Sequence, residues 1–225
     1  MATLRCQAPF ARHRILLVTV MLLLYAWLLL AKSPTDRSDW WLENVPLLAF
    51  LLAMALTYRK FAFRTSSYVL MAIFCLLHAV GAHYGYQNTP FDTWLRAHMG
   101  VQRSMYDRVV HTAFGLFLVA PLLEIASRAA KLRGVWRYIY ALAVLMAASA
   151  LYEIAEMAVA LIANPQLAGQ YLGLQGDVLD TQKDMLSALC GAAVAALFLA
   201  LRQWLGRRHN RREHDIVGGN AANER

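Results

Sequence analysis

Six apolar runs, separated by short polar segments, dominate this chain of 225 residues. They cover about residues 15–31, 43–58, 67–84, 105–125, 135–162 and 180–204. An α-helix needs roughly 20 mostly apolar residues to cross about 30 Å of hydrocarbon, where the backbone must satisfy its own hydrogen bonds. The pattern therefore predicts an all-α polytopic membrane protein, built as a bundle of six transmembrane helices.

The composition agrees with a membrane protein and argues against a nucleic-acid partner. Only 16% of the residues are charged, whereas a soluble domain carries about 25%. The net charge of +8 would suggest nucleic acid if it formed a patch on a soluble fold, but here the arginines lie in short segments between apolar runs. We predict the lipid bilayer as the partner, and no feature indicates an oligomeric state. The three cysteines form no disulfide or metal motif.

Lysine and arginine residues predict the orientation, because positively charged loops stay in the cytoplasm. Sixteen of the 22 lie in segments that six spans place inside, and six lie in the other segments. Both termini are therefore predicted to be cytoplasmic. Residues 1–14 form a basic N-terminus, residues 15–205 the six-helix transmembrane domain, and residues 206–225 a polar tail that we predict to be disordered.

Two capping signals lie in the polar segment from residue 85 to residue 105. Thr89, Pro90 and Asp92 predict the start of a short interfacial helix that ends at Gly100. Ser104 lies three residues before Asp107, a spacing that would allow Asp107 to cap the fourth span.

The costly polar residues fall at one end of the predicted bundle. A charge near the bilayer centre costs at least about 2.5–3.5 kcal/mol on insertion scales, so several at one depth indicate a shared, partly hydrated pocket. The predicted topology turns this pocket outward. The residues concerned are His78, Asp107, His111, Glu153, Glu156, Asp177, Asp180 and Asp184.

Two chemistries fit these residues. In the first, a divalent cation is held by carboxylates and an imidazole, and its bound water attacks an ester or phosphate. In the second, the same groups form a metal-free acid–base set or a proton relay. The predicted metal ligands are Asp107, His111, Glu153, Asp177, Asp180 and Asp184, and the predicted catalytic groups are Asp107, His111, Glu153 and Glu156.

The substrate of such a site would be a lipid-linked or cell-envelope molecule. Arg103 and Arg108 would clamp an anionic head group, with His78 and Gln182 as further substrate contacts. A transporter or envelope resistance factor that uses the carboxylates as an ion or proton site is the first alternative. A scaffold whose polar cluster only fixes helix packing, with Glu153 and Glu156 paired to arginine, is the second. Glu124 lies at the opposite end and is predicted to be solvated.

Three segments together resemble one protein family. They are residues 106–115 (YDRVVHTAFG), 149–156 (SALYEIAE) and 176–185 (GDVLDTQKDM). They resemble the YjdF-type bacterial inner-membrane proteins, whose function is uncharacterised, and more distantly the VanZ-like group associated with glycopeptide resistance. The resemblance implies a multi-pass protein of the bacterial inner membrane. It matches Asp107, His111, Glu153, Asp177, Asp180 and Asp184 to motif positions and departs from the expected pattern at Arg108 and Lys183.

Overall fold

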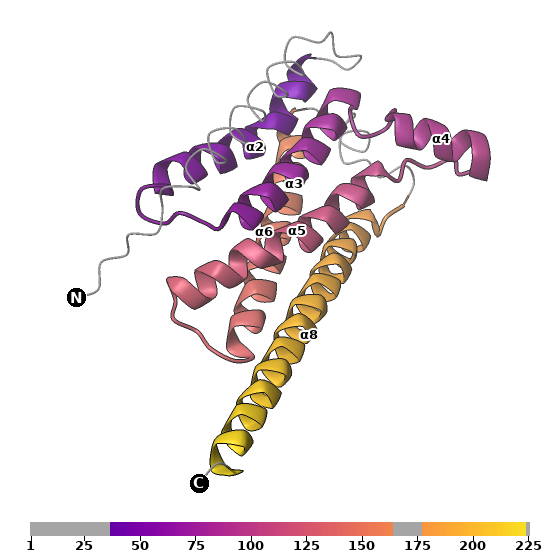
Figure 1. The fold of residues 1–225 in the computed structure, drawn as a ribbon. Helices are drawn as coiled ribbons and strands as arrows, with labels where there is room; N and C mark the ends of the chain where they lie inside the picture. The colour runs from indigo at the N-terminus through magenta and orange to yellow at the C-terminus, as the bar shows by residue number, and fades with distance from the viewer. Residues whose placement is uncertain (1–36, 164–176, 224–225) are drawn as a thin grey trace.

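The structure of the chain is a computed structural model that describes residues 37–163 and 177–223 (Figure 1). Its helices are α2 (Arg37–Thr57), α3 (Thr65–Tyr84), α4 (Pro90–Met99), α5 (Tyr106–Arg128), α6 (Trp136–Ala163) and α8 (Asp180–Asn223). All of these except α4 are long and apolar enough to cross a membrane. The predicted all-α, multi-pass membrane fold is confirmed, and the predicted first span, residues 15–31, lies outside the described residues.

Helix α5 lies at the centre of the bundle. It packs against α3, α6 and α8, while α2 packs on α3 and α6 packs on α8. Successive long helices alternate in direction, so the beginnings of α2, α5 and α8 lie at the same end as the short helix α4 (Figure 1). We call this end the α4 end of the bundle. Large apolar side chains of α2 and α8, such as Leu56 and Leu197, are exposed on the outside, as expected where lipid surrounds the helices.

Small residues let α5 and α8 approach until their backbones touch. A Cβ atom on Gly115 would overlap the carbonyl oxygen of Ala188, and one on Gly191 would overlap the carbonyl oxygen of Thr112. Ala188 and Ala192 are fully buried in the same contact. Without a hydrophobic driving force between helices in lipid, such close van der Waals packing is a main source of association.

The predicted cap of α4 is confirmed, and the predicted cap of α5 is wrong. Thr89 accepts a hydrogen bond from the backbone N–H of Asp92 and caps α4, which ends at Gly100 in the left-handed conformation. The Asp92 carboxylate then accepts the N–H groups of Met105 at 2.7 Å and Tyr106 at 3.2 Å, so α5 is capped by a residue of α4. Ser104 instead donates to the carbonyl oxygen of Tyr86.

Glu124, predicted to be solvated, is buried at the end of the bundle opposite α4. It accepts hydrogen bonds from the backbone N–H of Arg64 at 3.1 Å, from the Ser67 hydroxyl at 2.5 Å and from Arg128 at 2.8 Å. The first turn of α3 exposes N–H groups without helical acceptors, and this carboxylate satisfies one of them. Glu124 therefore joins α3 to α5.

Helix α8 continues as helix to Asn223, past the end of the predicted span near Trp204 and through most of the tail predicted to be disordered. A preformed helix extends by one hydrogen bond for each residue that it orders, and the Arg and Glu residues of this segment are good helix formers. The division into a domain ending at residue 205 and a separate tail stays a prediction.

Candidate functional site

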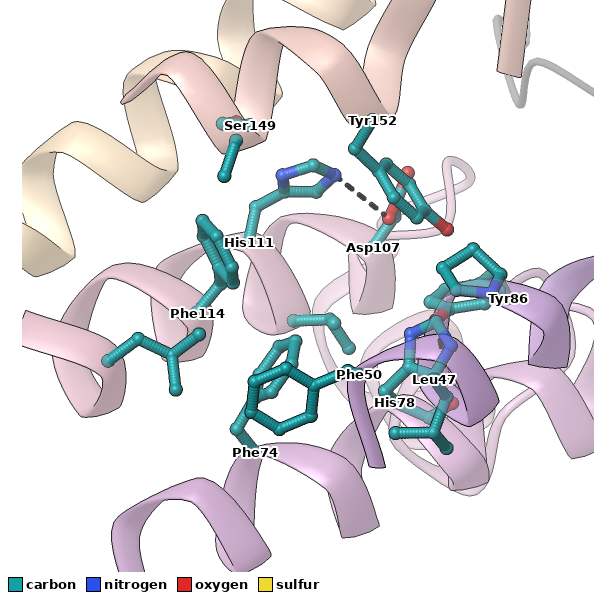
Figure 2. Close-up of a pocket in the computed structure, with 14 residues that line it drawn as sticks. Leu47, Phe50, Phe74, His78, Tyr86, Asp107, His111, Phe114, Ser149 and Tyr152 are labelled. Atoms are coloured by element: carbon teal, nitrogen blue, oxygen red, sulfur yellow. Dashed lines mark hydrogen bonds and ion pairs between the residues drawn. The ribbon is translucent and has the colours of Figure 1, made fainter. Parts of the chain in front are cut away.

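A cavity of about 150 Å³ lies between α2, α3, α5 and α6 (Figure 2). We call it the central pocket. Its polar part consists of His78, Tyr86, Asp107, His111, Ser149 and Tyr152, and its apolar part of Pro46, Leu47, Phe50, Phe74, Val110, Phe114, Leu118 and Ala148. Tyr86, Asp107 and His111 lie toward the α4 end of the bundle, and Phe74, Phe114 and Leu118 lie deeper between the helices, with Ser149 midway along α6.

Helical spacing explains why these residues share one cavity. Asp107, His111 and Phe114 recur at intervals of three or four along α5, so they face the same side of that helix. Phe74 and His78 do the same on α3. Each helix thus contributes a polar residue near the α4 end and an aromatic residue one turn further in.

His111 lies between two carboxylates from different helices. Its Nε2 atom is 3.3 Å from Oε1 of Glu153 on α6 and 3.6 Å from Oδ1 of Asp107 on α5. Glu153 is 7% exposed and His111 is also buried, whereas the side chain of Asp107 is 37% exposed and lines the pocket. An imidazole held beside two carboxylates is suited to take up and release a proton.

A second histidine has a structural role in the wall of the pocket. Nε2 of His78 lies 2.9 Å from the carbonyl oxygen of Glu43, which can only accept, so Nε2 carries the proton. Nδ1 then accepts from the Tyr86 hydroxyl at 2.6 Å. Burial raises the pKa of Tyr86 well above its usual value, which keeps this donor protonated. In its neutral form, His78 therefore ties α2, α3 and the segment after α3 together.

The Tyr86 side chain packs on a nearby glycine. Tyr86 has a φ of 55°, in the left-handed region, and its ring packs directly on Gly81, where a Cβ atom would lie 2.5 Å from Cε1 of the tyrosine. The close approach positions the hydroxyl at His78.

Two further glutamates extend the acidic surroundings of the pocket. The Tyr152 hydroxyl lies 3.5 Å from Oε2 of Glu43. Glu156, one turn after Tyr152, interacts electrostatically with Asp107, Glu43 and Glu153. Four carboxylates from α2, α5 and α6 thus gather around the polar part of the central pocket.

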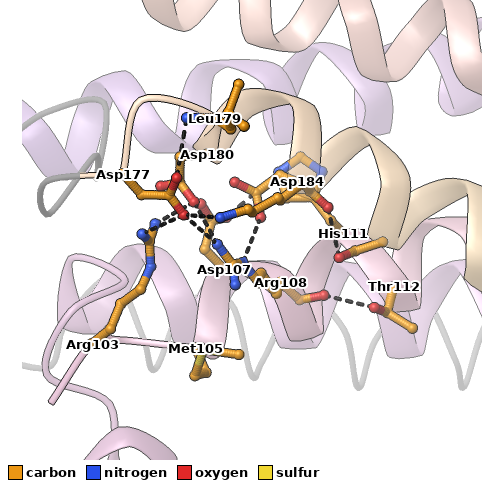
Figure 3. Close-up of polar contacts among 12 residues, drawn as sticks. Arg103, Met105, Asp107, Arg108, His111, Thr112, Asp177, Leu179, Asp180 and Asp184 are labelled. Carbon is orange, nitrogen blue, oxygen red and sulfur yellow. Dashed lines mark hydrogen bonds and ion pairs between the residues drawn. The ribbon is translucent and has the colours of Figure 1, made fainter. Parts of the chain in front are cut away.

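The other predicted site residues form an ion cluster that joins α5 to α8 and adjoins Asp107 (Figure 3). Arg103 pairs with Asp177 at 3.0 Å and with Asp180. Arg108 pairs with Asp180 at 3.0 Å, with Asp177 at 3.3 Å and with Asp184 at 3.6 Å. Asp180 and Asp184 are buried.

Asp177, at the edge of the ion cluster, is held ionised by its neighbours. The Lys183 ammonium group donates to it at 2.6 Å and the backbone N–H of Leu179 at 3.1 Å. These hydrogen bonds, the lysine first, lower the pKa of Asp177 from its usual value to about 2. The carboxylate therefore stays charged through the whole pH range in which the protein would be assayed.

These contacts bear on two sequence predictions. The arginines predicted to clamp an anion have aspartate partners, and three predicted metal ligands, Asp177, Asp180 and Asp184, have arginine partners. In the described part of the chain, no group of three or more His, Cys, Asp or Glu residues is arranged to hold a metal ion. The proposed metal and anion-binding roles stay predictions. Gln182 is exposed on α8, away from the residues that line the pocket.

The chain matches the family described as "Predicted membrane protein (DUF2238)" over residues 14–204. The chain belongs to this family. It is also 30% identical over 197 residues to the inner membrane protein YjdF of Escherichia coli (strain K12), a match that covers 87% of this chain and 92% of that protein. No solved structure matches the chain. The resemblance to the YjdF-type proteins is confirmed, and the wider VanZ-like likeness stays a prediction.

Sequence reasoning missed part of the site in this DUF2238 protein. Glu43 was assigned only to the start of a span, although it is an acidic residue at the same end as the others. Phe50, Phe74 and Phe114, which were not among the predicted site residues, line the pocket. Phe74 lies four residues from His78 on α3, and Phe114 lies three residues from His111 on α5. This spacing indicated that each pair shares a helix face, but only the packed structure shows that those faces enclose a cavity.

Proposed function

We propose that the central pocket binds an amphiphilic molecule, a lipid-linked or other cell-envelope compound, in the bacterial inner membrane. One observation carries this proposal: a single cavity leads from Asp107 and His111 to an apolar part that includes Phe50 and Phe74. An amphiphile has a matching arrangement, because its polar head is followed by an apolar chain. Binding sites for small molecules are commonly mostly apolar, with a few placed polar groups.

The proposal includes an orientation for the site. The α4 end faces the non-cytoplasmic side and both termini are cytoplasmic, which the distribution of Lys and Arg residues supports. Helix α4 exposes Phe91 and Trp94, two side chains suited to the interface between lipid and water. A ligand could then enter the pocket from the outer leaflet.

The chemistry proposed for the site is proton transfer at the polar head of the ligand. His111 would act as the acid–base group, Asp107 would contact the head, and Glu153 would orient and stabilise the imidazolium. The 3.3 Å and 3.6 Å separations from Nε2 of His111 support these roles. Glu156 would adjust the charge around Asp107.

Filling the pocket tests the proposal. Ala148 lines the cavity and is exposed to it, so Ala148→Phe is expected to occupy the space without displacing backbone. Amphiphile that co-purifies with the wild type, measured by native mass spectrometry, should fall at least about tenfold, because each methylene kept out of an apolar site forfeits about 0.8 kcal/mol. The matched control is Ala147→Phe, at an exposed position of α6 outside the lining. Equal retention in both variants would contradict the proposal.

A proton or ion site is the second candidate function, because His111 lies between two carboxylates from different helices. In this case the protein would move protons with a solute rather than bind an amphiphile. Proteoliposomes with an entrapped pH dye would then acidify or alkalinise on addition of solute, and Glu153→Gln should abolish the signal. A wild-type signal that persists in Glu153→Gln would exclude this role for the pair.

A further inference from the structure

The charges around the central pocket restrict what its ligand can be. Four carboxylates, those of Glu43, Asp107, Glu153 and Glu156, gather at its polar part, and none of the fourteen residues that line it is a lysine or an arginine. Of the two histidines that line it, His78 has both ring nitrogens bound to groups of the protein, and His111 lies between Asp107 and Glu153. A cationic head group would stabilise these carboxylates in their ionised form, and an anionic head group would oppose it.

The ion cluster does not supply the missing positive charge. Its three cations, Arg103, Arg108 and Lys183, make their ion pairs with Asp177, Asp180 and Asp184, so the cluster is neutral as a whole. The two arginines also act electrostatically on Asp107, but they make their ion pairs with the aspartates of the cluster. Asp107 and Glu153 thus share one histidine, His111, and the lining of the pocket adds no lysine or arginine.

Two buried polar atoms at the pocket have no partner within the described residues. Ser149 lines the cavity at 2% exposure, and its Oγ atom makes no hydrogen bond. Oε1 of Glu153, at 7% exposure, lies beside His111 but accepts no aligned hydrogen bond. Buried polar atoms normally have partners, so unsatisfied ones at a cavity indicate a missing polar group, which for the Glu153 oxygen must be a donor.

Aromatic rings flank the carboxylates. Tyr86 and Tyr152 line the pocket together with Asp107, Figure 2 shows Tyr152 beside Asp107, and the Tyr152 ring meets the His111 ring edge-on at 6.2 Å between centroids. Aromatic faces together with carboxylates are the usual recognition elements for an organic ammonium group. A bare metal ion would instead need three or more convergent ligand atoms, which the described residues do not offer.

We propose that the central pocket selects an amphiphile whose polar head is an organic ammonium group. This deepens the proposed function and rests on it. Asp107 pairs with the ammonium group, Tyr86 and Tyr152 contact it through their rings, and the Ser149 hydroxyl and Glu153 accept its remaining hydrogen bonds. The apolar chain lies along Phe50, Phe74 and Phe114.

Three amphiphiles with the same octyl chain and different heads test this selection. The full chain is held in a maltoside detergent, which carries no ammonium group, and octylammonium, octyl glucoside and octyl phosphate are titrated below their micelle concentrations by calorimetry. We expect the ammonium compound to bind about tenfold or more tightly than the glucoside, since one desolvated charge pair exceeds 1.4 kcal/mol. Octyl phosphate should show no saturable binding.

Variants separate the failure of this inference from the failure of the proposed function. Asp107→Asn should lower the ammonium affinity about tenfold and the glucoside affinity by much less, with Glu156→Gln as a second carboxylate variant if Asp107→Asn does not fold. Ala148→Phe should remove binding of every head group. If the glucoside or the phosphate binds as tightly as the ammonium compound and Ala148→Phe still blocks it, the head-group inference is wrong and the pocket stands. If no binding is sensitive to Ala148→Phe, the proposed function is wrong.

Discussion

Gly191→Ala is expected to destabilise the protein by about 2–3 kcal/mol, and Gly191→Val to prevent folding, because α5 and α8 touch through their backbones. An added Cβ atom would overlap the carbonyl oxygen of Thr112 and lie 3.0 Å from the backbone nitrogen of Leu116. Backbone atoms of a packed helix cannot turn away as a flexible side chain would. Relief requires the two helices to separate, which would disrupt the contact that also positions the ion cluster.

Gly206→Ala supplies a control in the same helix. Nothing lies within 4 Å of the Cβ atom that this substitution adds, so it should stabilise α8 by up to about 1 kcal/mol through helix propensity alone. Thermal or denaturant unfolding in detergent, followed by tryptophan fluorescence, measures both variants. If Gly191→Ala is as stable as Gly206→Ala, the close approach of α5 and α8 is wrong.

The positions of the helices could be predicted from the sequence, because a membrane leaves few alternatives. Apolar runs of about 20 residues must form helices there, and α3, α5 and α6 begin and end within a few residues of the predicted limits. The short helix α4 was predictable from Thr89, Pro90 and Asp92, because capping is a local interaction.

The meeting of Asp107, His111 and Glu153 was predictable in part. Their depths follow from the span boundaries, and polar groups at one depth avoid lipid by facing each other. Their separation from the ion cluster was not predictable. Asp107 and Arg108 are neighbours in sequence, but they point about 100° apart around α5, one toward the pocket and the other toward α8. Which neighbour each face meets depends on how the helices rotate against each other, and sequence periodicity does not give that rotation.

Helix caps formed by residues distant in sequence were not predicted, for a related reason. Asp92 caps α5 and Glu124 satisfies the start of α3, each across a gap of many residues. A carboxylate near a span end has the same appearance in sequence whether it is solvated or bound to another helix. Only tertiary packing distinguishes the two.

Arg108→Met is expected to cost about 3–5 kcal/mol of stability, since removing one partner leaves buried charge uncompensated. Arg108 contacts Asp177, Asp180 and Asp184, and the side chains of the last two are each 5% exposed. Arg108→Lys should have a stability between those of the wild type and Arg108→Met. An ammonium group keeps the charge but not the planar set of donors that reaches several carboxylates. Unfolding in detergent measures the series. Arg133→Met, at an exposed position, is the control and should change stability by less than about 0.5 kcal/mol.

Combining Arg108→Met with Asp180→Asn and Asp184→Asn tests whether Arg108 neutralises the aspartates or binds an anion. Neutral amides need no counter-charge, so the triple variant should be more stable than Arg108→Met alone if the arginine serves to neutralise the aspartates. Ligand binding in the central pocket should then persist in the triple variant, because the cluster lies outside the lining. Arg108→Met could instead be as stable as the wild type and lose binding of an anionic amphiphile. In that case the arginine is an anion clamp, as predicted from the sequence, and the division of the acidic residues between the ion cluster and the pocket is wrong.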